Sequence, residues 1–334
     1  MMMHLCEMGK NLVAEFSDFS ELRPEDLFLL AANSILAIRI KNFVDTKSSQ
    51  DAVAAFLKKA EGIQGSCKRV IGQPFSETKG DAEAKRSYFE KASEVSKDLH
   101  DAFPLRCPLD SLISLMRQKV KARGGAQVMK SRDGKEFSPG LVQVLNGDVL
   151  GHQKMLEREL DIGDLPSDCA GASQIDAYLY VDVPLVGGEL ILWKRSLDAD
   201  EYDRLRGGSD GISLPVLGLP KVVLKPKRGE LILFNAGSLH ATRGLPPTIH
   251  TEASESDIDS ICDALSEKSK DEEMETLEES SNTPERERDN DSRDVSPTDE
   301  KTFKRRPPEL GNCVTVSTSI LFRQAANKLL LFYS

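Results

Sequence analysis

Between residues 139 and 245 the chain is a succession of short apolar segments separated by glycine and proline. This pattern restricts the fold more than any other feature of the sequence. The segments cover residues 141–145, 175–183, 189–193, 221–224 and 230–234. Each has the length and the β-branched or aromatic content of a strand, and Asn146-Gly147, Pro184, Gly187-Gly188, Pro226 and Gly229 supply the breaks. Many short strands with such breaks are typical of a β-sandwich or barrel.

A long polar tract interrupts these strand-like segments. Residues 246–308 are rich in Ser, Glu, Asp, Lys and Pro and nearly free of aromatic residues. Such a tract cannot bury enough apolar surface to offset its chain entropy, so we expect it to be disordered. Strand-like sequence resumes at 313–322 and 328–333. We therefore expect one β core, formed by 131–245 and 309–334, with the acidic insertion 246–308 between its parts.

The N-terminal region, residues 1–130, has mainly helical periodicity. Ser48 is a candidate cap for a helix over 48–57, and helical patterns recur at 84–103 and 109–122. Residues 34–40 form a short apolar run that suits a strand. The expected fold class is therefore mainly β, with N-terminal helices packed on the β core.

The net charge of −10 belongs to one segment of the chain. Residues 251–300 hold 19 acidic and 5 basic residues, a net charge of −14, so the remaining residues carry +4. This distribution gives no strong signal for nucleic acid. The acidic insertion is a candidate docking segment for a protein partner. Its basic edge, Lys304-Arg305-Arg306, is interpreted as a solvated tether, with a nuclear-import or docking patch as the alternative.

The cysteines and the hydropathy pattern indicate a cytoplasmic or nuclear protein. The six cysteines lie far apart without a CxxC pair, so we expect reduced thiols and neither a zinc site nor a disulfide framework. The sequence has no run of about 20 apolar residues, the length that spans a bilayer. Residues 1–7 lack the long apolar stretch of a secretory signal.

Two phrases carry a family resemblance. They are 187–193 (Gly-Gly-Glu-Leu-Ile-Leu-Trp) and 226–234 (Pro-Lys-Arg-Gly-Glu-Leu-Ile-Leu-Phe), and the second is followed by Ser238-Leu239-His240. Their order resembles the C-terminal half of the iron(II)/2-oxoglutarate dioxygenase superfamily, in its prolyl-hydroxylase-like branch and close to small-molecule hydroxylases and halogenases. The resemblance covers about 139–245 and 311–334. It implies a double-stranded β-helix (jelly-roll or cupin-like), an Fe(II) ion, 2-oxoglutarate as cosubstrate and O2.

The resemblance also implies site residues. Such enzymes hold iron(II) with two imidazoles and one carboxylate. The distal histidine of the family pattern matches His240, and the first histidine matches His152, which follows the strand expected at 141–145. The histidines at positions 4, 100 and 250 lie in contexts that do not match. Tyr178 lies on a strand that often lines the cosubstrate pocket in the family, with a core position as the alternative.

Two positions depart from the family pattern. Lys154 stands where the carboxylate is expected, and halogenating members have a small residue there. Glu157 and Glu159 are alternative carboxylates. Cys313 stands where an arginine should pair with the far carboxylate of the cosubstrate. Arg243, three residues after His240, is the predicted cofactor-binding cation in place of this arginine, and Arg323 is the alternative.

The leading hypothesis is an iron(II)/2-oxoglutarate-dependent oxidoreductase of the hydroxylase type, acting on an unidentified small molecule or protein side chain. Its metal would be held by His152 and His240, with water, chloride or another carboxylate as third ligand. The alternative is a catalytically inactive oxygenase-fold protein that serves as a binding or scaffold module. A further interpretation attributes both the insertion and the missing arginine to a mis-spliced gene model.

Overall fold

The computed structural model describes residues 12–63, 68–119, 125–145, 147, 149–161, 163–164, 169, 172–244, 312–322 and 330–333. The chain divides into one unit of residues 1–246 and 310–334 and another of residues 247–309. The acidic insertion expected to be disordered lies outside the described residues. The first unit is described below.

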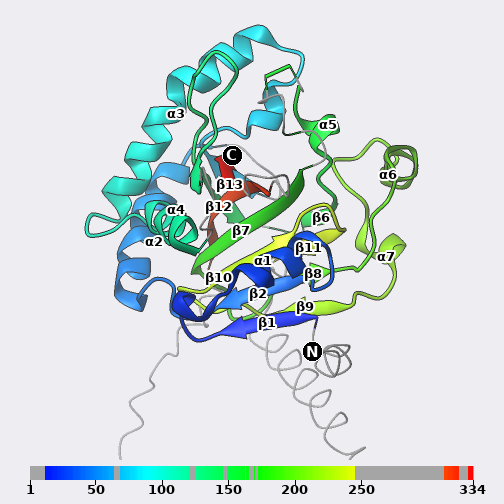
Figure 1. Cartoon of the computed structure of the whole chain (residues 1–334), viewed down its shortest axis with the longest axis horizontal. Coiled ribbons are helices and arrows are strands. Elements are labelled where there is room, and N and C mark those ends of the chain that lie inside the picture. Colours follow the sequence, from blue (N-terminus) through cyan, green and yellow to red (C-terminus); the bar gives the residue numbers. More distant parts are fainter. Residues whose placement is uncertain are drawn as a thin grey trace, which may run out of the picture. The chain divides into compact units, whose positions relative to one another are not determined.

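A nine-stranded, mostly antiparallel sheet forms the centre of this unit (Figure 1). Its neighbouring strands are, in order, β1 (Val13–Phe16), β2 (Ala37–Ile40), β10 (Leu231–Asn235), β7 (Ser173–Asp182) and β12 (Cys313–Phe322). Beyond β12 the sheet has two branches, because β12 is long enough to pair with two strands on its other side. Its first half pairs with β5 (Leu141–Leu145), which pairs with β3 (Lys68–Ile71). Its second half pairs with β13 (Leu330–Tyr333), which pairs with β4 (Ala126–Val128).

A smaller sheet faces part of the large one. Its four antiparallel strands are, in order, β6 (Val149–His152), β11 (His240–Thr242), β8 (Leu190–Leu192) and β9 (Val222–Leu224). The inner positions of β8 are apolar, and Leu190 and Leu192 pack in one core cluster with Tyr180 and Phe234 of the large sheet. This shared core holds the two sheets together.

Four helices cover the large sheet on the side away from the small one. They are α1 (Pro24–Ala31), α2 (Thr46–Ala60), α3 (Ala82–Ala102) and α4 (Pro108–Lys119). Figure 1 shows α2, α3 and α4 on one side of β7 and β12, with α6 (Ala199–Arg206) and α7 (Leu214–Leu217) on the other. The apolar stripes of the covering helices pack on the sheet through the largest core cluster. The short elements are α5 (Leu156–Glu159) and the 3-10 helices η1 (Phe19–Glu21) and η2 (Phe75–Thr78).

The predicted elements are found with small shifts in their ends. The helices and strands expected in the described regions are all present, and β12 has the predicted bounds. The predicted cap of α2 was wrong by three residues. The helix begins at Thr46, and the Asp45 side chain accepts a hydrogen bond from the Ser48 backbone N–H at 2.9 Å. Asp45 is the better cap because its carboxylate also favours the positive end of the helix dipole.

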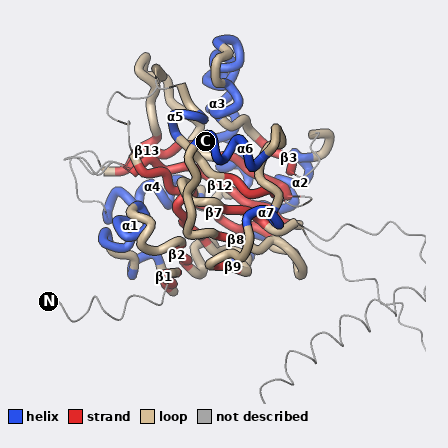
Figure 2. The backbone as a smooth tube through the Cα atoms, turned by 90° about the vertical axis from the view of Figure 1, so that its right-hand side faces the viewer, coloured by secondary structure: helices blue, strands red, loops and turns tan. Residues whose placement is uncertain are grey.

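The fold is therefore mixed helix and sheet, built on a large and mostly antiparallel sheet. Figure 2, turned by 90°, shows α7 and strands β8 and β9 of the small sheet in front of β7 and β12. No helix in the described part of the chain is both long and apolar enough to cross a membrane. The closure of the sheets into a double-stranded β-helix stays a prediction at this point.

Candidate functional site

A cavity of about 320 Å³ opens between the two sheets. Strands β5, β7 and β12 of the large sheet form one wall, and β6 and β11 of the small sheet form the other. Its polar lining is dense for a space between sheets, which are usually packed with apolar side chains. The polar lining residues used below are His152, Lys154, Glu159, Asp176, Tyr178, His240, Ser317, Ser319 and Tyr333.

The structure brings both predicted metal ligands to this cavity. His240 of β11 is the direct cross-strand partner of His152 of β6. Side chains directly opposite each other in an antiparallel pair lie on the same face, about 4.5–5.5 Å apart at Cβ. The pairing follows from the fold, because β11 is inserted between β6 and β8.

Both imidazoles are in the form that binds a metal ion. His240 is buried and its Nδ1 donates a hydrogen bond to the carbonyl oxygen of Ser238 at 2.9 Å, so its Nε2 carries a free lone pair. Burial lowers the pKa of His240. Burial lowers the pKa of His152 to about 3, and the positive charges that His240, Lys68 and Lys154 can carry nearby make a smaller contribution in the same direction. The two rings are therefore neutral at pH 7, as ligation requires.

Lys154 enters the cavity as part of an ion pair. Its Nζ donates to Asp176 Oδ1 at 3.0 Å and to Ser319 Oγ at 2.8 Å, and lies 2.9 Å from Asp176 Oδ2. The Ser319 hydroxyl donates in turn to Asp176 Oδ1 at 2.9 Å. The Asp176 side chain is 1% exposed and that of Lys154 is 28% exposed. Burial alone would lower the pKa of Lys154, but the charges of Asp176 and Glu159 outweigh it and raise that pKa.

Glu159 and two tyrosines complete the polar wall. Burial raises the pKa of the Glu159 carboxyl to about 7, although the Lys154 charge opposes that shift. Burial also raises the pKa of Tyr178 and of Tyr333, so both phenols keep their protons and can donate. The Tyr178 ring packs edge-on against Phe234, with the ring centroids 5.0 Å apart. Tyr178 thus lines the cavity and also joins the core, as the two sequence alternatives allowed.

The other sequence candidates lie away from the cavity or outside the described residues. Arg243 is exposed, has its Nε 3.9 Å from Glu189 Oε2, and is not among the residues that line the cavity. Cys313 is fully buried in the core shared by the two sheets and does not line the cavity. The Glu157 side chain and Arg323 fall outside the described residues.

Among the described residues, the cavity brings no set of three metal-binding donor atoms close together. In the described part of the chain, one set of three His, Cys, Asp or Glu side chains has all its donor atoms within 4.8 Å, and it lies near α3 and α4. No carboxylate in the described cavity therefore joins the two imidazoles in such a set. Lys154 cannot take this role because its amine is protonated and offers no lone pair.

Asp176 is the site residue that the sequence analysis missed. It lies in the apolar strand β7, two residues before Tyr178, and alternate strand residues share a face. A carboxylate between Ile175 and Ala177 in such a strand needs a buried partner. That requirement was a usable signal, although the sequence did not identify Lys154 as the partner.

Comparisons with known proteins return structural neighbours only. No family model matches the chain, and no curated protein matches its sequence. A novel N-substituted L-amino acid dioxygenase from Burkholderia ambifaria AMMD is similar over 93% of this chain and 91% of its own, with 12% identity and a TM-score of 0.49. Its complex with alpha-KG gives 13% identity and a TM-score of 0.48, over 93% of this chain and 90% of that chain.

HygX from Streptomyces hygroscopicus, with nickel and 2-oxoglutarate bound, is a more distant neighbour. It covers 67% of this chain and 81% of its own, with 16% identity and a TM-score of 0.34. The first two neighbours are thus named as dioxygenases, the class that the sequence motifs resemble, and the third has 2-oxoglutarate bound. With all three TM-scores below 0.5, these likenesses assign no role to a residue of this chain.

Proposed function

We propose that this chain is an oxygenase of the iron(II)/2-oxoglutarate class whose metal ion is held by His152 and His240. The observation that carries the proposal is the direct pairing of these two neutral histidines across β6 and β11, at the wall of a polar cavity. Ionisable groups with strongly shifted pKa values that converge on a cavity are typical of functional sites.

The order of the strands supports a double-stranded β-helix as the frame of this site. From β5 to β8 the chain alternates between the large and the small sheet, and from β9 to β12 it alternates again. The four central strands of the large sheet lie in the order β5-β12-β7-β10, and the small sheet has the order β6-β11-β8-β9. Winding of this kind is expected when eight strands form a two-sheet jelly roll.

The two imidazoles would hold the iron, with the remaining positions left to water, an anion or the cosubstrate. Bound iron(II) would supply activation of O2 coupled to decarboxylation of 2-oxoglutarate. An isolated ammonium about 4 Å from a divalent ion would oppose binding by roughly 8 kcal/mol at an effective dielectric of 20. Asp176 offsets much of this repulsion, because it forms a neutral pair with Lys154.

Tyr178 is the residue that we propose for contact with the cosubstrate. Its protonated phenol lines the cavity and can donate a hydrogen bond to a carboxylate. Arg243 is left out of the proposed site because it does not line the cavity. The substrate would be a small molecule or a protein side chain with a C–H bond that reaches the two histidines.

A second candidate function is a non-catalytic binding module with the same fold. The specific observation in its favour is the closed Lys154–Asp176–Ser319 network, because it engages Lys154, the residue at the sequence position of the family's carboxylate, in an ion pair with a buried acid. The buried Cys313, in place of a carboxylate-binding arginine, agrees with this candidate. Both candidates use the same cavity and differ in whether it retains iron.

Anaerobic titration of the full chain with iron(II), followed by 2-oxoglutarate, separates the two candidates. A saturable visible charge-transfer band at one iron per chain, lost in His152→Ala and in His240→Ala, supports the oxygenase. His100→Gln is the matched control, because His100 lies outside the cavity, and it should leave the band unchanged. No charge-transfer band in the natural chain, with the band gained in Lys154→Asp, supports the binding module.

A further inference from the structure

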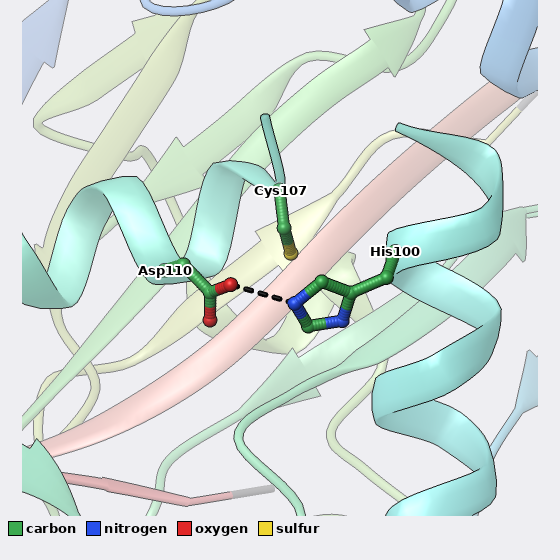
Figure 3. A group of neighbouring side chains, drawn as sticks. All are labelled: His100, Cys107 and Asp110. Carbon is green, nitrogen blue, oxygen red and sulfur yellow. Dashed lines mark hydrogen bonds and ion pairs between the residues drawn. The ribbon is translucent and has the colours of Figure 1, made fainter. Parts of the chain in front are cut away.

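Three side chains with different donor atoms converge where α3 ends and α4 begins. His100 lies in the last turn of α3, Cys107 directly precedes α4, and Asp110 lies in the first turn of α4. One donor atom of each residue lies within 4.8 Å of the donor atoms of the other two. Figure 3 shows the three side chains pointing toward one another, with His100 on one helix, Asp110 on the other and Cys107 on the segment just before the second helix. This cluster has no part in the cavity described above.

The imidazole of His100 is already oriented as a metal ligand. Its Nδ1 donates to the carbonyl oxygen of Ser96 at 2.6 Å, and its Nε2 lies 2.6 Å from Asp110 Oδ2. Metal-binding histidines commonly donate their second ring N–H to a backbone carbonyl or a carboxylate, which fixes the tautomer and the ring plane. A metal ion at Nε2 would replace the proton that this nitrogen donates to Asp110.

The thiol of Cys107 supplies the third donor. Cys107 is buried, and burial raises its pKa, while the backbone N–H groups of Asp110 and Leu109 partly oppose the shift by favouring the thiolate. A buried thiol in this state is a poor nucleophile. Both ring nitrogens of His100 also have other partners, so the ring is not placed as a base for Cys107. The arrangement therefore does not fit a Cys-His-Asp hydrolase triad.

A plain ion pair between helices explains only part of the cluster. The contact of His100 with Asp110 needs no sulfur, and an exposed pair of this kind contributes at most about 1 kcal/mol. The convergence of an imidazole, a thiol and a carboxylate matches the donor set that proteins use for zinc-type ions.

We propose that His100, Cys107 and Asp110 form a binding site for a divalent transition-metal ion of the zinc type. One imidazole nitrogen, one thiolate and one carboxylate oxygen would bind the ion, and water would complete a tetrahedral set. Metal–ligand distances of about 2.0–2.3 Å separate the donor atoms of such a set by roughly 3.3–3.8 Å. The His100 and Asp110 side chains are 48% and 59% exposed, so they have room to open from 2.6 Å to that spacing.

Binding would link the end of α3 to the start of α4. The thiol proton would be released to solvent as the metal–sulfur bond forms. The expectation of no zinc site rested on the absence of a CxxC pair, and the proposed site would use a single cysteine instead. The spacing of the three residues, H-x6-C-x2-D, matches no zinc motif with paired cysteines.

Cobalt(II) titration of the reduced full chain tests this site, because thiolate-bound cobalt(II) has a near-ultraviolet sulfur-to-metal band. The titration is done in the His152→Ala background to remove the cavity histidine pair. Since no cysteine lines the cavity in the described structure, cobalt bound there would give no sulfur band. We expect one equivalent of cobalt to saturate the band and added zinc to abolish it.

Variants identify the ligands. Cys107→Ala should abolish the sulfur band, and Asp110→Asn, on an exposed side chain, should weaken cobalt binding at least about tenfold. Cys169→Ala is the matched control, because Cys169 is also buried and reduced but belongs to no such cluster among the described residues. A chain without the sulfur band, or a band that survives in Cys107→Ala, overturns the proposal. Neither outcome bears on the iron titration of the cavity.

Discussion

Lys154, through its pairing with Asp176, is the residue that makes this cavity differ most from a metal site with three protein ligands. Among the described residues, replacing it by methionine would leave the buried Asp176 carboxylate with the Ser319 hydroxyl as its one remaining side-chain partner. Removing one member of a buried ion pair leaves an uncompensated charge and typically costs 3–5 kcal/mol. We expect Lys154→Met to lower the free energy of unfolding by about 3 kcal/mol, measured by urea denaturation.

An exposed lysine provides the matched control for that measurement. Lys130 pairs with Glu136 at 3.1 Å, and both side chains are mostly in solvent. Lys130→Met removes the same ammonium and should change the free energy of unfolding by less than about 1 kcal/mol. Equal effects of the two substitutions would show that the Lys154–Asp176 pair is not a buried interaction in solution.

Glu159 should make stability depend on pH. Burial raises the pKa of its carboxyl from 4.5 to about 7. Between these values the folded state keeps a proton that the unfolded chain releases, so the free energy of unfolding falls as pH rises from about 4.5 to about 7. Glu159→Gln removes this contribution. We expect the stability of the variant relative to the natural chain to rise across that interval and to stay constant above it.

Urea denaturation of both chains at about pH 4 and about pH 8 measures this difference. The titration of His152, whose pKa is lowered to about 3, works in the opposite direction in acid. It is common to both chains and therefore cancels in the comparison. The same difference at both pH values would mean that Glu159 is ionised normally in the folded protein.

Single residues could be located from the sequence where one motif or one strand end contained the information, and not where two distant segments met. His240 follows one of the two family-like phrases and His152 follows an expected strand, and the structure pairs them across β6 and β11. Their role as metal ligands stays a prediction. The Lys154–Asp176 pair was not predicted, because any buried acid can accept any nearby cation. The His100 cluster was missed for a similar reason, since its ligands come from two helix ends.

At the scale of elements, Gly229 fixes how the turn before β10 meets the segment before α2. Its φ is +79°, and a Cβ at this position would lie 2.2 Å from the carbonyl oxygen of Val44. The Val44 N–H also donates to the Gly229 carbonyl at 3.1 Å. Gly229→Ala therefore adds a backbone clash to the usual cost of a left-handed conformation. We expect thermal denaturation to show a large loss of stability.

Gly134 provides a control that distinguishes the backbone clash from the cost of the left-handed conformation. Its φ of +81° is nearly the same, but a Cβ there would meet no atom within 4 Å. Gly134→Ala should cost about 1–2 kcal/mol for the left-handed conformation alone. Gly229→Ala should cost about 1–3 kcal/mol more, the usual range for overpacking. If both glycines tolerate alanine equally, the close approach to Val44 does not occur in solution.

Strands with a continuous apolar run were predictable, and short pairing segments were not. The segment 313–322 is long and rich in β-branched residues, and β12 has these bounds. The strands β1, β3, β4, β6 and β11 have only three or four residues and no comparable run. They are strands because a neighbouring strand offers a free edge, which is a property of the assembled sheet.

At the scale of the whole molecule, the sheet is assembled from segments on both sides of the insertion. Strand β12 lies between β7 and β5, although residues 247–309 separate it in sequence from both. The strand pairs that hold β12 are all made with the described residues of the first unit. A flexible connection of another length would allow the same strand pairs to form, because the entropic cost of closing a loop rises only slowly with its length.

Replacing residues 247–309 by a short Gly/Ser linker should therefore leave the core intact. We expect the thermal midpoint of the shortened chain to stay within about 2 °C of the full chain, and its iron titration to be unchanged. A midpoint lowered by more than about 5 °C would mean that the inserted residues stabilise the sheets. An unchanged core would mean that the acidic insertion is not needed for folding and is available to bind the protein partner proposed for it. Capture experiments with the full and the shortened chain would then show whether a partner binds the insertion or the cavity.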